Sequence, residues 1–427
     1  MPCPNYPDYC LDLPGASTGG RSLDAAPLSL AGLGRTQDCV LRPPGYQPLT
    51  HEEWERWRQP ARYDREVLKA RSAAGIHTSG VALVGGLLLG VLAAGGRVAR
   101  GCAVVEARPA ERGYLVKVSR RDGYEAVVAQ ALVLATGGFD RDPELRDRYL
   151  PAHLVASGSS PGNRGDGLRI ALELGGTTEN LGEGWWMPML SLPEETVEGE
   201  VAYRSLVRER ALPRQIMVGR HGRRFANEAA PYHQLTRELL EEGADGRSAH
   251  QPCYLIFDHG FRSRYSLPGV ARDGPPGPSV TSAATIGELG ARLWLDREEL
   301  EATVGRWNEA CAEGVDRDHG RGRSAFDRYG GDRDLATPNL GPLDRPPYYA
   351  VRVLPGTIGS KGGPVTDASG CVVDRGGKPI DGLYAVGNAA AFWTGSGYPG
   401  PGATLGAGMT FGYLSGRAAA GLVNPDR

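Results

Sequence analysis

A glycine- and proline-rich loop near the C-terminus holds the residues best suited to contact a ligand. Gly395–Gly400 reads GSGYPG, and further glycines open the apolar segment that follows. The glycine spacing of this run matches the G-x-G-x-x-G pattern of dinucleotide-binding folds. That pattern also requires a strand that ends at the first glycine and an acidic residue about twenty positions downstream, and neither is present at Gly395. We therefore discount it as a Rossmann fingerprint. Gly400, Gly402 and Gly406 still surround a helix start, where backbone N–H groups can face an electron-rich ligand.

Two further glycine turns follow apolar strands. LVLATGGF at 132–139 and GLYAVGN at 382–388 each run from a strand into such a turn, and SSPGNRGDG at 159–167 opens a helix. Strand, turn and helix in this order are typical of the units that line a dinucleotide site. Because the carboxyl ends of parallel strands meet at one edge of a sheet, we predict that Gly137 and Gly387 face one cleft.

Composition excludes several classes of protein. Glycine makes up 62 of 427 residues, about 15% against roughly 7% in average proteins, with no fixed period, which excludes collagen. The 48 basic and 50 acidic side chains give a net charge of −2, so a polybasic nucleic-acid binder is excluded too. The seven cysteines are scattered without zinc-site spacing and the N-terminus has no signal-peptide pattern, so we expect reduced thiols and a cytoplasmic location.

One apolar stretch is long enough to raise the question of a membrane span. Residues 79–96 carry no charge over eighteen positions, which is the lower limit for a spanning helix. Glycines interrupt the stretch, and its flanks show neither a positive-inside bias nor an aromatic belt. The pattern therefore favours a buried helix that packs on a sheet, and we expect no transmembrane segment. A strand at about 98–107 should follow the helix.

The remaining pattern predicts an α/β fold with a discontinuous domain. A short charged helix follows Thr50, and a hairpin turns at Asp122-Gly123. Residues 184–343 differ in having mixed strands, more aromatics and a long helical stretch that a Thr285/Glu288 capping box opens. We predict a Rossmann-like domain from 1–183 and 344–427, with 184–343 inserted as an α+β substrate domain. The charged run at 314–334 alternates in sign, which indicates a solvated face or loop.

The C-terminal segment GGPVTDASGCVVDRGGKPIDGLYAVGNAAAFWTGSGYPGPGATLGAGMTFGYLSGRAA closely resembles that of 3-ketosteroid Δ1-dehydrogenases. The resemblance continues through LVLATGGF, NRGDGLRIALELGG, RRFANEAAPYHQ, GVDRDHGRGRSAFDRYGGD and GPLDRPPYYAV, and the opening YPDYCLDLPGASTGGRSL is similar to the family's P-D-Y segment. It implies an FAD enzyme on the fumarate reductase/succinate dehydrogenase flavoprotein fold. It also implies a 3-ketosteroid-like substrate, an external electron acceptor, and a place in steroid degradation and lipid metabolism.

The resemblance implies four catalytic positions. Tyr398 and Gly402 match the tyrosine hydroxyl and backbone N–H that bind the steroid C3 carbonyl. Tyr232 matches the base that removes the C2 proton, and Tyr9 matches a tyrosine that assists it, while hydride leaves C1 for flavin N5. Two donors on a ketone oxygen stabilise an enolate by roughly 3–4 kcal/mol each. A lone tyrosine is more often a packing residue, and we interpret four others as core or pocket-wall residues: Tyr203, Tyr254, Tyr265 and Tyr348.

The same resemblance implies the cofactor contacts. Asp166 and Asn388 match positions near the ribityl or ribose hydroxyls, although both residues are also common in turns. Trp185, Trp186 and Trp393 line a steroid cleft or serve as core. The expected cofactor-binding residues are Ala135, Thr136, Gly137, Gly138, Asn163, Asp166, Gly387, Asn388, Thr404 and Leu405.

One part of the family pattern has no counterpart. Family members open with a glycine-rich β-α-β unit that holds the FAD pyrophosphate, and nothing before Tyr6 resembles it. We expect that this first unit is absent, because of a start placed too late, a fragment, or a second chain that completes the site. The alternatives are a Δ4-dehydrogenase, a fumarate-reductase-like enoate reductase, or a truncated non-catalytic paralogue.

Overall fold

The computed structural model describes residues 2–3, 6–19, 22–43, 45–58, 60–197 and 199–421. The chain separates into two compact units, Met1–Arg100 and Gly101–Arg427, which we describe one at a time. These boundaries do not test the predicted insertion at 184–343, which stays a prediction. In the described part of the chain, no helix combines the length and the apolar character that a membrane span requires.

The first unit consists of short elements. Thr50 caps helix α1 as predicted: its Oγ1 accepts from the Glu53 N–H at 3.2 Å, and the Glu53 carboxylate accepts from the Thr50 N–H at 3.0 Å. The elements are β1 (Pro2–Cys3), β2 (Ser22–Leu23), β3 (Leu28–Ser29), η1 (Ala31–Cys39), α1 (His51–Trp57), η2 (Pro60–Arg62), α2 (Arg65–Ala73), β4 (Ile76–His77) and α3 (Ser79–Ala93).

Helix α3 corrects the expectation of a buried helix on a sheet. One face packs through Val81 on Leu30 and the residues of η1. A Cβ on Gly85 would lie 2.3 Å from Leu30 Cδ2, so this glycine permits the close approach. The opposite face is apolar and between 47% and 54% exposed at Val84, Leu87 and Val91.

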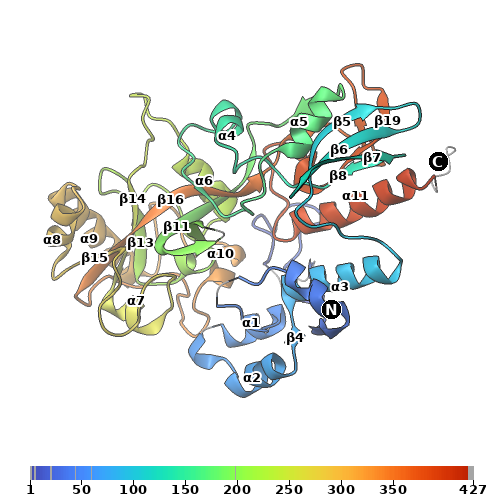
Figure 1. The fold of residues 1–427 in the computed structure, drawn as a ribbon. Helices are drawn as coiled ribbons and strands as arrows, with labels where there is room; N and C mark the ends of the chain where they lie inside the picture. Colours follow the sequence, from blue (N-terminus) through green and yellow to red (C-terminus); the bar gives the residue numbers. More distant parts are fainter. Residues whose placement is uncertain are drawn as a thin grey trace. The chain divides into compact units, whose positions relative to one another are not determined.

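The second unit contains the glycine turns. It begins with an antiparallel meander, β5 (Ala103–Pro109), β6 (Tyr114–Arg120) and β7 (Gly123–Ala129), which confirms the predicted hairpin, although β5 starts later than residue 98. Next, β8 (Leu132–Leu134) pairs in parallel with β19 (Pro379–Ala385), which also pairs with β18 (Cys371–Val373). Helices α4 (Pro143–Tyr149), α5 (Asp166–Glu173) and α11 (Ala403–Ala419) follow the turns (Figure 1).

The largest sheet is built around one long strand, β16 (Tyr348–Ser360). The path runs β12 (Glu200–Ser205), β11 (Gly184–Val197), β16, β14 (Cys253–Asp258) and β13 (Gln215–Val218), with β15 (Val280–Ala283) and β9 (Ala156–Ser157) also against β16. Helix α6 (Tyr232–Leu239) packs on β11 and β16 (Figure 1). The smaller elements are β10 (Thr178–Glu179), η3 (Glu209–Ala211), α7 (His259–Arg264), α10 (Ala325–Gly330), β17 (Gly363–Pro364) and η4 (Gly387–Ala389).

The long helical stretch divides into α8 (Ile286–Arg292) and α9 (Arg297–Glu313), with Trp294 at a φ of 59° between them. Thr285 caps α8 as expected, since its hydroxyl accepts from the Glu288 N–H at 3.1 Å. The capping box differs from the prediction, because the Glu288 carboxylate accepts from the Ala284 N–H at 3.2 Å instead.

The charged run at 314–334 is only partly the solvated loop that its alternating signs predicted. Four of its side chains are between 1% and 4% exposed. Each forms hydrogen bonds inside the second unit, which offset the cost of burying a charge. The four are Asp316, Arg321, Asp327 and Asp332.

Candidate active site

Two of the predicted tyrosines meet in the second unit. Tyr232 is the first residue of α6, and Tyr398 lies in the loop that leads into α11. Although 166 positions separate them, their hydroxyls share a hydrogen bond, and their ring centroids are 5.4 Å apart. The structure therefore places two phenol groups side by side, as the resemblance implied.

Aromatic rings fix the orientation of Tyr398. The His233 ring stacks on the Tyr398 ring with centroids 5.1 Å apart and an interplanar angle of 14°. Trp185 meets the Tyr398 ring edge-on at 5.7 Å. Tyr232 is 7% exposed and lies in an apolar cluster with Met187 and Met189 of β11. Both phenol rings are therefore held by packing, and their hydroxyls meet.

Burial dominates the electrostatics of the pair. It raises the pKa of Tyr232 well above the ordinary value of 10.0, Tyr398 acts in the same direction, and the nearby Arg210 opposes the shift. Burial also lowers the pKa of His233 to about 4. At neutral pH the imidazole is therefore uncharged, and its Nε2–H donates to the Ser396 carbonyl at 3.2 Å.

Tyr9 belongs to the first unit and is 38% exposed. It follows Asp8, whose carboxylate accepts from the Ser17 N–H at 2.7 Å and whose own N–H donates to the Ser17 carbonyl at 2.8 Å. Its predicted role beside Tyr232 stays a prediction, since the two units are described separately.

The predicted glycine turns leave one edge of the β8–β19 pair. Leu134 pairs with Ala385 in parallel register, and the Val386 N–H donates to the Leu134 carbonyl at 3.0 Å. The carboxyl ends of β8 and β19 therefore lie side by side, and they lead into residues 135–138 and 387–388. The shared edge that the prediction required is confirmed, and the common cleft for Gly137 and Gly387 stays a prediction.

The third predicted turn lies against the first. The Gly165 N–H donates to the Gly138 carbonyl at 3.1 Å, and the Gly167 N–H donates to Thr136 Oγ1 at 3.2 Å. A Cβ on Gly137 would come within 2.3 Å of Asn163 Oδ1, so a side chain here would displace Asn163. The exposed Asp166 begins α5 in this group.

The start of α11 is open. Gly402 is its N-cap, with a φ of 90°, and no side chain caps the helix. Nothing lies within 4 Å of where a Cβ on Gly402 would be, and Thr404 and Leu405 form the first turn. Free N–H groups and the positive end of the helix dipole suit an electron-rich ring edge or an anion. Together with the glycine turns, this helix start fits a flavin nucleotide.

Asn388 has a structural bond that the sequence did not indicate. Its Oδ1 accepts from Trp185 Nε1 at 2.9 Å, which ties the Gly387 turn to β11. Trp185 and Trp186 are buried, at 1% and 3% exposed, whereas Trp393 is 64% exposed. The first two tryptophans are therefore core residues, and a direct flavin contact by Asn388 stays a prediction.

Comparison with known proteins agrees with this geometry. The sequence matches the family described as FAD binding domain over residues 13–405. A 4-oxocyclohexanecarboxylate 2-dehydrogenase of Sinomonas cyclohexanicum is 41% identical over 98% of this chain and 74% of its own length. A 3-oxosteroid 1-dehydrogenase of Mycobacterium tuberculosis is 34% identical over 96% of this chain and 78% of its own length. The chain belongs to the FAD-dependent 3-oxosteroid 1-dehydrogenase family.

The fold agrees as well. The crystal structure of a 3-ketosteroid Δ1-dehydrogenase from Sterolibacterium denitrificans aligns with a TM-score of 0.85 and 31% identity, over 99% of this chain and 81% of that chain. The predicted α/β flavoprotein fold is confirmed. FAD is the cofactor of this dehydrogenase, and the ten predicted contact residues stay predictions one by one.

Sequence reasoning missed two cations beside the tyrosines. Lys361 and Arg210 are 0% and 1% exposed, and each donates to a backbone carbonyl in the segment before one of the tyrosines. The signal for Lys361 was its rarity, since the chain has only four lysines among 48 basic residues. For Arg210 no local pattern existed, because the carbonyls before Tyr232 that it reaches lie 18 and 20 positions away in sequence.

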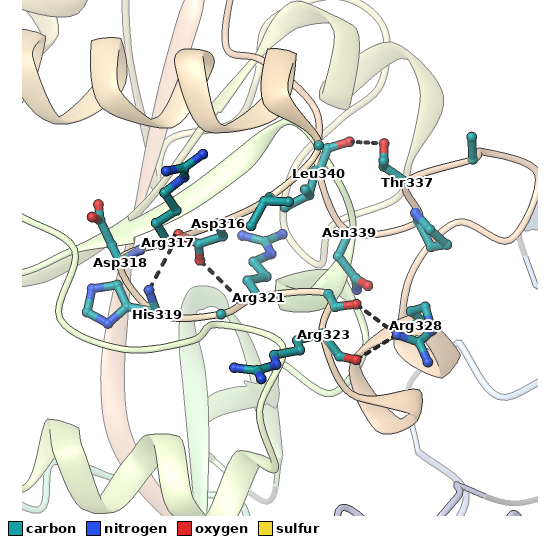
Figure 2. A pocket seen from close by; sticks show the side chains of 16 residues that line it. Asp316, Arg317, Asp318, His319, Arg321, Arg323, Arg328, Thr337, Asn339 and Leu340 are labelled. Atoms are coloured by element: carbon teal, nitrogen blue, oxygen red, sulfur yellow. Dashed lines mark hydrogen bonds between the residues drawn. The ribbon is translucent and has the colours of Figure 1, made fainter.

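A cavity of about 780 Å³ lies elsewhere in the dehydrogenase, on the loop that contains Asp316 and Arg321. Figure 2 shows the His319 and Arg321 N–H groups pointing to the Asp316 carboxylate, at 3.4 and 3.1 Å. That carboxylate also accepts from Arg224 at 2.9 Å. The buried charges of this wall are therefore already paired, and none of the predicted site residues lines the cavity.

Proposed function

We propose that this dehydrogenase introduces a carbon–carbon double bond next to the carbonyl of a cyclic ketone. The observation that carries the proposal is the hydrogen-bonded pair of hydroxyls, from the buried Tyr232 and the half-buried Tyr398, beside the open start of α11. One hydroxyl can bind the ketone oxygen while the other takes a proton from the adjacent carbon. If the substrate group bound at these hydroxyls were a carboxylate, free cationic donors would be favoured there instead.

In the proposed reaction Tyr398 and the Gly402 N–H donate to the ketone oxygen. The ketone thereby replaces Tyr232 as the partner of the Tyr398 hydroxyl. These donors stabilise the negative charge that develops on oxygen, which makes the α-hydrogen more acidic. Tyr232, as tyrosinate, removes that hydrogen as a proton, and the β-hydrogen leaves with its electron pair, so the C–C bond becomes a C=C bond.

Bound FAD would accept the β-hydrogen as a hydride, and an external acceptor would then take the two electrons. The residues that would hold it are the glycine turns at 135–138 and 387–388, the Asn163–Asp166 segment, and the first turn of α11. These groups provide backbone donors and close approach, which a flat dinucleotide requires.

The raised pKa of Tyr232 shapes this chemistry. A buried tyrosine is a stronger base once it is ionised, but a smaller fraction is ionised at neutral pH. The cation Arg210, whose guanidinium carbon lies 5.9 Å from the Tyr232 ring centroid, favours the ionised form, whereas Tyr398 opposes ionisation. Turnover should therefore rise with pH as Tyr232 loses its proton.

For the substrate, we propose a 3-ketosteroid, with 4-oxocyclohexanecarboxylate as the second candidate. The steroid is supported by the 34%-identical relative and by the structural alignment, whereas the smaller keto acid is supported by the 41%-identical relative. Both molecules contain the same reacting unit, a ring ketone with hydrogens on the α- and β-carbons. The cytoplasmic location and a role in steroid degradation remain part of the proposal.

The test uses the purified dehydrogenase loaded with FAD and an artificial electron acceptor. A 3-keto-4-ene steroid and 4-oxocyclohexanecarboxylate are compared by kcat/KM, and the product is identified by its new conjugated absorbance and mass loss of two hydrogens. Deuterium at the α- or the β-carbon should slow turnover. Oxidation of neither ketone, or an unchanged rate with both labels, would contradict the proposal.

A further inference from the structure

The loop that holds Tyr398 is fixed through two consecutive carbonyl groups. The Gly397 carbonyl accepts from Lys361 Nζ and, at 2.8 Å, from Thr394 Oγ1. The Ser396 carbonyl accepts from His233 Nε2 at 3.2 Å and from an Arg237 Nη1 at 3.4 Å. Four donors therefore converge on the two peptide groups that directly precede Tyr398, in a loop whose glycines give it little intrinsic stiffness.

Lys361 is the buried member of this group. It is 0% exposed, and its ammonium lies 4.8 Å from the Trp185 ring centroid and 5.4 Å from that of Phe392. Within the described residues it forms no ion pair, and burial lowers the pKa of its ammonium while Glu183 opposes this. The two aromatic faces and the Gly397 carbonyl therefore take the place of solvent around this charge.

Arg210 has the same relation to Tyr232. It is 1% exposed and donates to the carbonyls of Ala230 and Glu228, in the segment that runs into Tyr232, and to the Leu206 carbonyl at 3.2 Å. Its guanidinium also faces the Tyr232 ring. Each phenol thus follows a backbone segment that a buried cation holds.

We propose that Lys361 and Arg210 are matched positioning residues, which hold the backbone before Tyr398 and Tyr232 so that the two hydroxyls meet. The proposal rests on the proposed function of the tyrosine pair. A neutral donor would satisfy the same carbonyls at a smaller desolvation cost, because burying an ammonium or guanidinium group is expensive. The charge of Arg210 has a further use, because its guanidinium carbon lies 5.9 Å from the centroid of the ring on which a tyrosinate develops.

The experiment compares Lys361→Met and Arg210→Met with Lys378→Met, a matched control at an exposed lysine outside the site. Hydrogen–deuterium exchange is measured on the FAD-loaded proteins without substrate. Lys361→Met should speed exchange about tenfold at 394–402 and leave 226–236 unchanged. Arg210→Met should show the opposite pattern. With a ketone substrate, kcat should fall on the order of 100-fold in both variants while KM changes less than about threefold.

The exchange measurement separates the two proposals. If the parent oxidises no ketone but each variant loosens only its own tyrosine segment, the proposed function is wrong and the positioning roles stand. The positioning roles would be overturned if the exchange rate of each methionine variant stayed within twofold of the parent at both 394–402 and 226–236. They would also be overturned if kcat of the methionine variants stayed within threefold of the parent. If Lys361→Met does not fold, Lys361→Gln decides, because it keeps a donor without the charge: slow exchange at 394–402 with kcat within threefold of the parent supports the positioning role, and slow exchange with a 100-fold lower kcat overturns it.

Discussion

Two buried polar clusters share one segment of the chain and differ in how their groups are paired. Arg224 and Glu228 belong to a network with Asp316 and Arg321, whose charged atoms lie between 2.8 and 3.2 Å apart. Tyr232 follows Glu228 by four positions and belongs to the tyrosine pair. The network contains two positive and two negative side chains, so its charges balance within the fold.

The contacts that the structure describes around the tyrosine pair are of another kind. Its hydroxyls bind each other, and its cations bind backbone carbonyls. A network of buried charges that protein groups balance is costly to disrupt, because removal of one partner leaves an uncompensated buried charge. Two neutral hydroxyls that bind one another can exchange that bond for a ketone oxygen. The difference predicts that substitutions in the network change stability, whereas substitutions in the pair change turnover.

The largest effect is expected for Tyr232→Phe. Loss of the base should lower kcat by roughly 10³- to 10⁴-fold, because no other group takes the α-proton. The free energy of unfolding should change little, since the phenyl ring fills the same apolar cluster. The measurement is steady-state turnover of a ketone substrate together with a urea unfolding curve. Full turnover by this variant would show that the pair is not the proton acceptor.

Glu228→Gln should break the network. Arg224 and Arg321 would lose a buried carboxylate that accepts at 2.8 and 3.2 Å, and an uncompensated buried charge costs about 3–5 kcal/mol. The expected result is that loss in the free energy of unfolding from urea titration, with kcat of the folded fraction within a few-fold of the parent. A loss of turnover without a loss of stability would place Glu228 in the reaction.

The dependence of stability on pH provides an independent test of the same network. The neighbouring arginines overcome the effect of burial and lower the pKa of Glu228 and Asp316 to about 2 each, below their ordinary values of 4.5 and 3.8. Both carboxylates therefore stabilise the fold above about pH 5, and this stabilisation is lost as the pH falls toward 2. Glu228→Gln should flatten the decline of stability between pH 5 and 3.

Tyr398→Phe should have a smaller effect on turnover than Tyr232→Phe. It removes one donor to the ketone oxygen and leaves the Gly402 N–H, which lowers kcat by about 100-fold. A kcat within threefold of the parent would assign the ketone contact elsewhere. The variant also leaves the Tyr232 hydroxyl without its partner, so a shift in the pH profile of kcat should accompany the loss.

The comparison also shows what a sequence can and cannot predict. The parallel strands that end in Gly137 and Gly387 were predictable, because apolar runs and glycine turns are local signals. The contact between Tyr232 and Tyr398 was predictable only through the family resemblance. Neither residue differs in its local pattern from a packing tyrosine.

Long-range partners explain most of what was missed. The alternating charges at 314–334 predicted a solvated loop, yet Asp316 and Arg321 are buried because Arg224 and Glu228, about 90 positions away, complete the network. The roles of Lys361 and Arg210 likewise become visible only through the backbone carbonyls that they reach. The exposed face of α3 was missed because an apolar helix shows no difference between its two faces in composition.

Tyr265→Phe gives the smallest expected change and tests the comparison at a tyrosine outside the pair. Tyr265 is 3% exposed and its hydroxyl donates to Asp332 at 2.7 Å, while Arg264 also donates to that carboxylate. Because Arg264 remains, the variant should lose one charge-assisted hydrogen bond, about 1.5–2 kcal/mol of the free energy of unfolding. Its kcat should stay within about twofold of the parent, since Asp332 and not a ligand satisfies this hydroxyl. If kcat instead fell as far as in Tyr398→Phe, loss of a tyrosine hydroxyl would lower turnover wherever it lies in the fold. The distinction between hydroxyls paired within the fold and hydroxyls open to substrate would then be wrong.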